Sequence, residues 1–148
     1  MAEKGVIDFG AEAARMLPLI LREAMSHQEV IFSKEGMNIS YVLILEVLEE
    51  KGPTNMTDLT NIVGFTMSAG TAIVDKMIGL ELAKRERSRE DRRVVLVEIL
   101  AKGRSLVEQV RKMRRDAANQ MFSVLTDEEK NEYLRLLRKV CEGIRARQ

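Results

Sequence analysis

The sequence predicts a mainly α-helical fold that carries one small β-hairpin. Apolar residues make up 45% of the 148 residues, whereas aromatic residues make up only 4% and Trp is absent. A core must therefore be built from Leu, Ile, Val, Met and Ala, which suit helices better than stacked sheets. The exception is the stretch from Arg85 to Leu100, RERSREDRRVVLVEIL, whose second half is rich in the aliphatic residues typical of a strand.

Four helices are predicted before this stretch. In the first, apolar residues recur at helical spacing, and Pro18 should either kink the helix or begin it. Asn38 is placed to act as the N-cap of the second helix, and Asn55 opens the third after a turn that reads KGPTN. Gly64 closes the third helix. The predicted ranges are residues 8–32, Ile39 to Glu50, Asn55 to Val63 and Thr66 to Met77.

The hairpin and two further helices complete the chain. Gly103 is expected to break the chain after the hairpin, and Thr126 and Glu129 form a Thr-x-x-Glu capping box that starts the last helix. The predicted segments are a strand from Leu80 to Lys84, a turn at 88–91, a return strand from Arg93 to Ile99 and a long helix from Arg104 to Leu125.

Two short helices followed by a charged hairpin are the parts of a winged helix-turn-helix, in which the second short helix enters the major groove. The apolar faces of the first and last helices have no partner inside one small lobe, which indicates a homodimer. We therefore divide the chain into an N-terminal dimerisation helix (1–37), a DNA-binding lobe (38–103) and C-terminal dimerisation helices (104–148).

Charge is unevenly distributed along the chain. Residues 1–50 carry a net charge of −5, residues 51–115 carry +6, and residues 116–148 carry 0, which together give the net +1 of the whole chain. A basic middle segment beside an acidic one predicts a local surface for a polyanion.

The hairpin concentrates this positive charge. From Lys84 to Arg93 there are six basic and three acidic residues. Ion pairs on a solvated hairpin would explain the acids, but exposed pairs contribute at most about 1 kcal/mol each and leave the excess of bases unexplained. The excess therefore favours contact with nucleic acid. Asp91 is placed to bind backbone amides at the turn and to orient Arg93.

The fourth helix has small residues on the face opposite its apolar side, which would let its backbone approach base edges. The alternative is an exposed helix that simply carries small residues. Gly70 lies in the middle of this helix, where Gly costs roughly 0.5–1 kcal/mol relative to Ala. Either a close approach to a neighbour or simple tolerance would explain it.

Two motifs resemble the MarR family of bacterial and archaeal transcription regulators. The stretch LTNIVGFTMSAGTAIVDKM is similar to the helix-turn-recognition-helix pattern of the family, and REDRRVVLVEILAKG is similar to its wing signature. Two positions depart from the pattern. Glu81 stands where the family usually has a left-handed Gly, and Gly79 lies two residues earlier, so we expect the end of the fourth helix to be either shifted or strained. Leu100 stands where the family usually has Thr before the long helix, so that helix needs another cap, for which Ser105 or water is the candidate. The matching residues are Ser68, Thr71, Val74, Asp75, Asp91, Arg93 and Gly103.

The resemblance implies a cytoplasmic homodimeric regulator, a repressor that binds a pseudo-palindromic operator in double-stranded DNA. A small, often aromatic, effector would release it by favouring one of two conformations. The wing would be organised by Asp91. The DNA-contacting residues implied are Thr66, Met67, Ser68, Ala69, Thr71, Ala72 and Lys76 in the recognition helix, with Arg87, Arg89 and Arg93 in the wing.

Two other functions remain open. The protein could be a winged-helix dimer that binds another protein, or a thiol sensor acting through its single cysteine, Cys141, which otherwise suits a packed core or an interface. Met16, Met25, Met113 and Met121 could line an adaptable pocket.

We predict neither an enzyme nor a cofactor. His27 and Glu23 would supply two metal ligands, whereas zinc normally needs three or four protein ligands. The sequence shows no catalytic constellation, secretory signal or membrane-spanning run.

Overall fold

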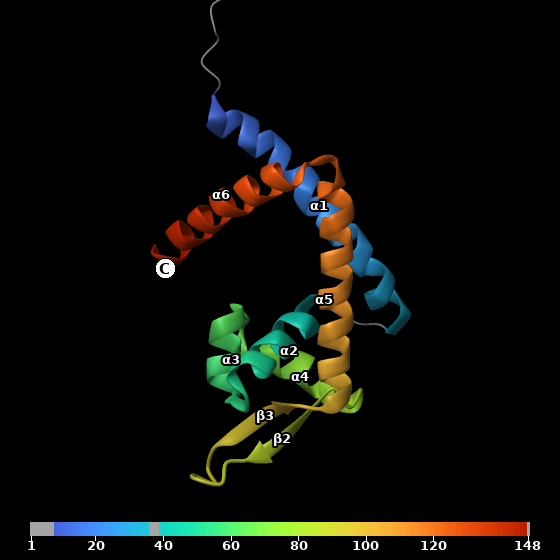
Figure 1. The fold of residues 1–148 in the computed structure, drawn as a ribbon. Helices are drawn as coiled ribbons and strands as arrows, with labels where there is room; N and C mark the ends of the chain where they lie inside the picture. The colour runs from blue at the N-terminus through green and yellow to red at the C-terminus, as the bar shows by residue number, and fades with distance from the viewer. Residues whose placement is uncertain (1–7, 36–38, 148) are drawn as a thin grey trace, which may run out of the picture. The chain divides into compact units, whose positions relative to one another are not determined.

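The computed structural model describes residues 8–35 and 39–147, with side chains described for 8–24 and 39–147. The chain divides into two compact units, of which the first ends at Arg114 and the second begins at Arg115. In these residues the elements are six α-helices, one 3-10 helix and three strands (Figure 1). They are α1 (Phe9–Glu35), α2 (Ile39–Lys51), β1 (Thr54–Asn55), α3 (Met56–Val63), α4 (Met67–Gly79), β2 (Ala83–Arg87), β3 (Val95–Ile99), α5 (Ala101–Met121), η1 (Phe122–Val124) and α6 (Asp127–Arg145).

The helices before the hairpin lie close to their predicted ranges. Pro18 lies inside α1 and does not begin it. The Oδ1 of Asn55 caps α3 by accepting a hydrogen bond of 2.9 Å from the amide of Asp58. Gly64 ends α3 in the left-handed conformation, at φ 73°. The N-cap predicted at Asn38 lies outside the described residues.

Three of the four predicted strand boundaries were wrong by two or three residues, and the end of the return strand at Ile99 is confirmed. Residues 80–82 close the end of α4, where the amide of Leu82 donates to the carbonyl of Met77, so β2 begins only at Ala83. The amide of Val94 donates to the carbonyl of Asp91 inside the turn, so β3 begins at Val95 and not at Arg93. β1, predicted as a plain turn, pairs with β3 and gives the strand order β1-β3-β2.

Gly103 does not break the chain, because it lies inside α5. A Cβ atom at this position would lie 2.3 Å from the carbonyl oxygen of Leu82 and 2.9 Å from Cγ1 of Ile99. The glycine therefore permits α5 to pass against the base of the hairpin. The helix predicted from Arg104 to Leu125 begins at Ala101 and ends at Met121, and η1 follows it. The Thr126–Glu129 capping box of α6 is confirmed.

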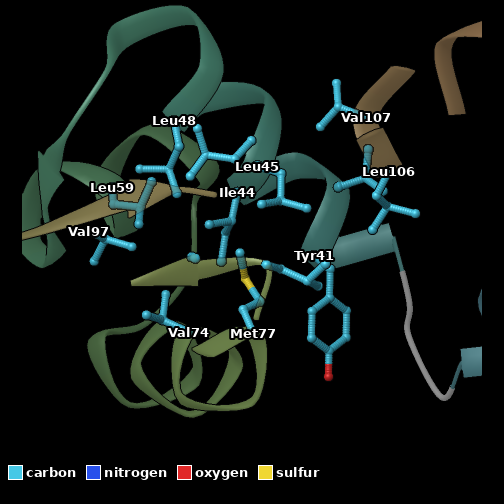
Figure 2. Packing of buried hydrophobic residues seen from close by; sticks show 14 of the residues in the cluster. Tyr41, Ile44, Leu45, Leu48, Leu59, Val74, Met77, Val97, Leu106 and Val107 are labelled. Carbon is cyan, nitrogen blue, oxygen red and sulfur yellow. The ribbon is translucent and has the colours of Figure 1, made fainter. Parts of the chain in front are cut away.

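A single apolar core holds α4 and the hairpin together (Figure 2). Its centre is α2, whose Ile44, Leu45 and Leu48 are at most 1% exposed. Contributions from the other elements come from α3, α4, the hairpin base and the first half of α5: Leu59, Val74, Met77, Leu82, Ala83, Val97, Ile99, Leu106, Val107 and Val110. Among the described helices, none combines the length and the apolar character needed to cross a bilayer.

Gly70 is explained by contact between α3 and α4. It is buried, and a Cβ atom placed on it would lie 2.3 Å from Cγ2 of Thr60. The hydroxyl of Thr60 donates to the carbonyl of Met56 at 2.9 Å, which fixes the orientation of this side chain. The glycine therefore lets the two helices of the helix-turn-helix pack closely.

We expect Gly70→Ala to lower the free energy of unfolding by about 1–3 kcal/mol, the usual cost of overpacking. Thr60→Ser removes the methyl group that clashes, so the double variant should recover most of this loss. Chemical denaturation at a fixed protein concentration measures both effects. Additive losses in the double variant would show that the clash is not the cause.

Glu81 takes the left-handed conformation predicted at this position, with φ 60°, and among the described non-glycine residues it alone has a positive φ. α4 ends at Gly79, but the left-handed residue that follows it is Glu81, so the strain expected at this position is present. The left-handed region costs an L-residue roughly 1–2 kcal/mol.

Glu81→Gly should therefore raise the free energy of unfolding by about 0.5–1 kcal/mol, since part of the relief is offset by the greater freedom of Gly in the unfolded chain. Glu81→Ala is the matched control, because it removes the carboxylate but keeps the strained backbone. Equal gains in the two variants would assign the effect to charge and not to backbone conformation.

Candidate nucleic-acid interface

The recognition helix α4 begins at a side-chain cap. The Oγ1 of Thr66 accepts a hydrogen bond of 3.2 Å from the amide of Ala69, so Thr66 precedes the helix. Val74 and Met77 are fully buried beneath the helix. Those core contacts fix which face is turned outward.

The outward face carries the residues that the sequence singled out. Met67, Ser68, Ala69, Ala72 and Lys76 are exposed, and Thr71 is half-buried. Apart from Met67 and Lys76 these side chains are small, so a flat ligand can come close to the helix backbone. Hydroxyl groups can bond to phosphates or bases, and methyl groups can meet the thymine methyl.

The hairpin has two chemically different faces, because successive side chains of a strand point to opposite sides. On the face away from the core, Lys84 pairs with Glu86 at 2.6 Å and with Glu98 at 3.1 Å. The hydrogen bond from Lys84, with a smaller contribution from Arg89, lowers the pKa of Glu86. On the core face, Arg85 pairs with Asp75 of α4.

Side-chain bonds shape the turn between the strands. The Oγ of Ser88 accepts a hydrogen bond from the amide of Glu90 at 3.2 Å. The Oδ1 of Asp91 accepts one from the amide of Arg93 at 2.9 Å. A hydrogen bond of this kind is expected of a residue that organises a wing.

The side chains of four hairpin arginines are not held in ion pairs within the described part of the chain, although Arg89 acts at longer range on Glu86. Lys84 and Arg85 are held in ion pairs, so local pairing accounts for two of the six bases. The remaining arginines are exposed and form no ion pair with any residue that the structure describes: Arg87, Arg89, Arg92 and Arg93. Their guanidinium groups are free to bind phosphate oxygens, for which their planar donor geometry is suited.

Sequence reasoning missed the link between Asp75 and Arg85. Asp75 was noted only as part of the helix pattern, and Arg85 only as one of six bases. The sequence does contain one signal for this link. Successive side chains of a strand point to opposite faces, so Arg85 lies on the same face of β2 as buried Ala83, which is the face turned toward the helices.

The structure says less about two other candidate sites, the metal site at His27 and the thiol of Cys141. The side chain of His27 lies outside the described ones, and within the described residues no group of three or more potential metal ligands occurs. Cys141 is exposed. The expectation of a place in the core of the chain was therefore wrong, because the apolar side of α6 stays open to solvent here. An interface position remains a prediction.

The comparison with protein families identifies the chain. Residues 26–110, more than half of its length, match the family described as transcriptional regulator SarA/Rot. The chain belongs to this family.

Curated relatives of this SarA/Rot regulator are described as helix-turn-helix (HTH) transcriptional regulators. It is 29% identical to the HTH-type transcriptional regulator MhqR of Bacillus subtilis, over 86% of each chain. It is 26% identical to YpoP of the same organism, an uncharacterized HTH-type transcriptional regulator, over 84% of this chain and 88% of the relative.

Solved structures place the SarA/Rot regulator among winged-helix proteins of the MarR type. A MarR family protein from Bacillus stearothermophilus superposes with a TM-score of 0.81 at 25% identity, covering 90% of this chain and 94% of that one. BldR of Sulfolobus solfataricus, a transcriptional regulator, gives 0.66 at 29% identity, covering 96% and 99%. The chain is thus a DNA-binding winged-helix transcription regulator, and MarR-type regulators bind DNA as dimers and are not enzymes.

Proposed function

We propose that the protein binds operator DNA as a homodimer, with α4 in the major groove and the hairpin arginines on the adjacent backbone or minor groove. The observation that carries this is the set of four exposed arginines at and beside the hairpin turn, which form no ion pair with the residues that the structure describes. Arginine binds phosphates and narrow minor grooves, whereas small residues on α4 suit base edges. Met67, Ser68, Ala69, Ala72 and Lys76 are the candidate base or backbone contacts, with Thr66 and Thr71 at the edges of that surface.

The apolar surface outside the DNA-binding lobe supports a dimer. In α1, Leu17, Leu19 and Leu21 are each more than 50% exposed, and in α6 Val140 and Ile144 are 58% and 52% exposed. Large apolar side chains gathered on helices typically mark an association surface. A two-fold dimer would present two copies of α4 to half-sites about one helical turn apart, and hence to a pseudo-palindrome.

Regulation would act on this dimer. We infer a repressor that leaves DNA when a small, often aromatic, effector favours a second conformation, because effector-controlled repression is consistent with the family. The protein would act in the cytoplasm, where operator DNA is found.

We expect Arg87→Ala and Arg93→Ala each to weaken binding to the operator and to reduce its salt dependence. Each phosphate that is no longer neutralised should lower the log–log slope by about 0.9. Fluorescence anisotropy with an operator duplex, selected from genomic fragments and titrated at several salt concentrations, measures this. Arg135→Ala is the control, since it removes the same charge from α6, where Arg135 pairs with Glu132 at 2.7 Å.

The same titration separates the proposal from a protein-binding adaptor. An unchanged slope in both wing variants would mean that these arginines do not contact DNA. Failure of the unmodified protein to select any duplex, even in dilute buffer, would favour the adaptor function.

We expect Val140→Glu to dissociate the dimer, because it places a charge in a surface that the dimer would bury. Sedimentation velocity should show monomers at concentrations where the unmodified protein is dimeric, and operator affinity should fall in parallel. Arg135→Gln changes the net charge by the same amount on the polar side of α6 and should leave the dimer intact. A dimer that persists in Val140→Glu would remove α6 from the interface.

A further inference from the structure

We propose that Asp75 is a positioning residue for DNA recognition, which acts through its ion pair with Arg85 to fix the recognition helix relative to the wing. This inference rests on the proposed function, because it matters only if α4 and the hairpin bind one duplex together. Neither residue belongs to the DNA-contacting set named above.

The pair joins the two reading elements directly. Asp75 lies in the second half of α4, and Arg85 is the central residue of β2. The Nη1 of Arg85 donates to the Oδ1 of Asp75. Among the described residues this is the sole ion pair that joins α4 to the hairpin, because Lys84 bonds only within the sheet.

The pair lies where the core of the hairpin ends. Along the core face, Ala83 is buried opposite Ile99, and Arg85 follows opposite buried Val97. The next pair, Arg87 and Val95, is exposed. Apolar packing thus holds the hairpin base against α4, and the ion pair provides the last link before the turn with its free arginines.

A carboxylate on the recognition helix needs an explanation, because an unpaired Asp75 beside phosphates would oppose binding. Its side chain is 55% exposed and that of Arg85 is 32% exposed. Pairing neutralises Asp75 and restricts the angle between helix and hairpin. A rigid arrangement lowers the entropic cost of binding, so it should favour an operator that both elements can contact at once.

The test measures affinity for the operator and for an unrelated duplex in the unmodified protein, Asp75→Asn, Arg85→Gln and the double variant. Each single variant should lose roughly 3- to 30-fold in operator affinity, within the usual range for coupled neighbours. Affinity for unrelated DNA should change much less. The double variant should be no weaker than Arg85→Gln, because either substitution already breaks the pair.

Glu86→Gln is the matched control. It raises the net charge by the same amount as Asp75→Asn and lies next to Arg85 in β2, but it leaves the link to α4 intact. It should bind the operator as tightly as the unmodified protein or more tightly. Hydrogen exchange of residues 83–87 in free protein should be faster in Asp75→Asn than in Glu86→Gln, which tests the link without DNA.

Three results would overturn the inference. If Asp75→Asn binds the operator as well as Glu86→Gln does, Asp75 only repels phosphate. If Arg85→Gln weakens binding while Asp75→Asn strengthens it, Arg85 contacts DNA itself. Equal losses on operator and unrelated DNA would show general destabilisation. If the unmodified protein prefers no duplex, the proposed function fails and takes this inference with it, a result distinct from the other three.

Discussion

The structure depends on the close contact between α5 and the base of the hairpin. At Gly103 the helix backbone passes so near to Leu82, Ile99 and Leu45 that any side chain would collide with them. This contact places the hairpin base in the core that also buries the inner face of α4. One packed cluster therefore sets the position of both elements that we expect to meet DNA, and the outer surface of each is left for polar and charged residues.

Charge is organised by strand geometry as well as by composition. Alternation along β2 sends Lys84 to one face, where it meets Glu86 and Glu98, and Arg85 to the other, where it meets Asp75. At the turn, Asp91 accepts a hydrogen bond from the amide of Arg93, and Glu90 is exposed. The net charge of the chain, +1, conceals this division. Ion pairs thus hold Lys84 and Arg85 near the base of the hairpin, whereas the arginines nearer its tip form none with the described residues.

Much of this fold could be predicted from the sequence, because the relevant signals are local. The caps at Asn55, Gly64 and Thr126 depend on residues at most a few positions away, and the structure has all of them. The errors involve distant partners. β1 is two residues long and exists because β3 lies beside it. Gly103 was misjudged as a helix breaker because the atoms it must avoid belong to residues outside its own helix.

Some features of the candidate site could likewise be predicted from the sequence, and others could not. Exposed arginines and a helix with small outer residues follow from charge and periodicity, so sequence alone could propose them. The role of Asp75 could not be predicted from spacing alone, because it depends on how the hairpin packs on α4. The sequence likewise does not show that Gly70 is needed because Thr60 packs against it. Both cases require the packing of α4 against another element.

The order β1-β3-β2 leaves β2 as the long free edge of the sheet, since β1, at the other edge, has only two residues. Free strand edges invite pairing with further strands, and proteins commonly prevent this with charged side chains. Four of the five residues of β2, in the sequence AKRER, are charged. The same side chains that give the hairpin its charge therefore also disfavour edge-to-edge association, and a sequence that neutralised them would leave β2 open to pairing with a strand of another molecule.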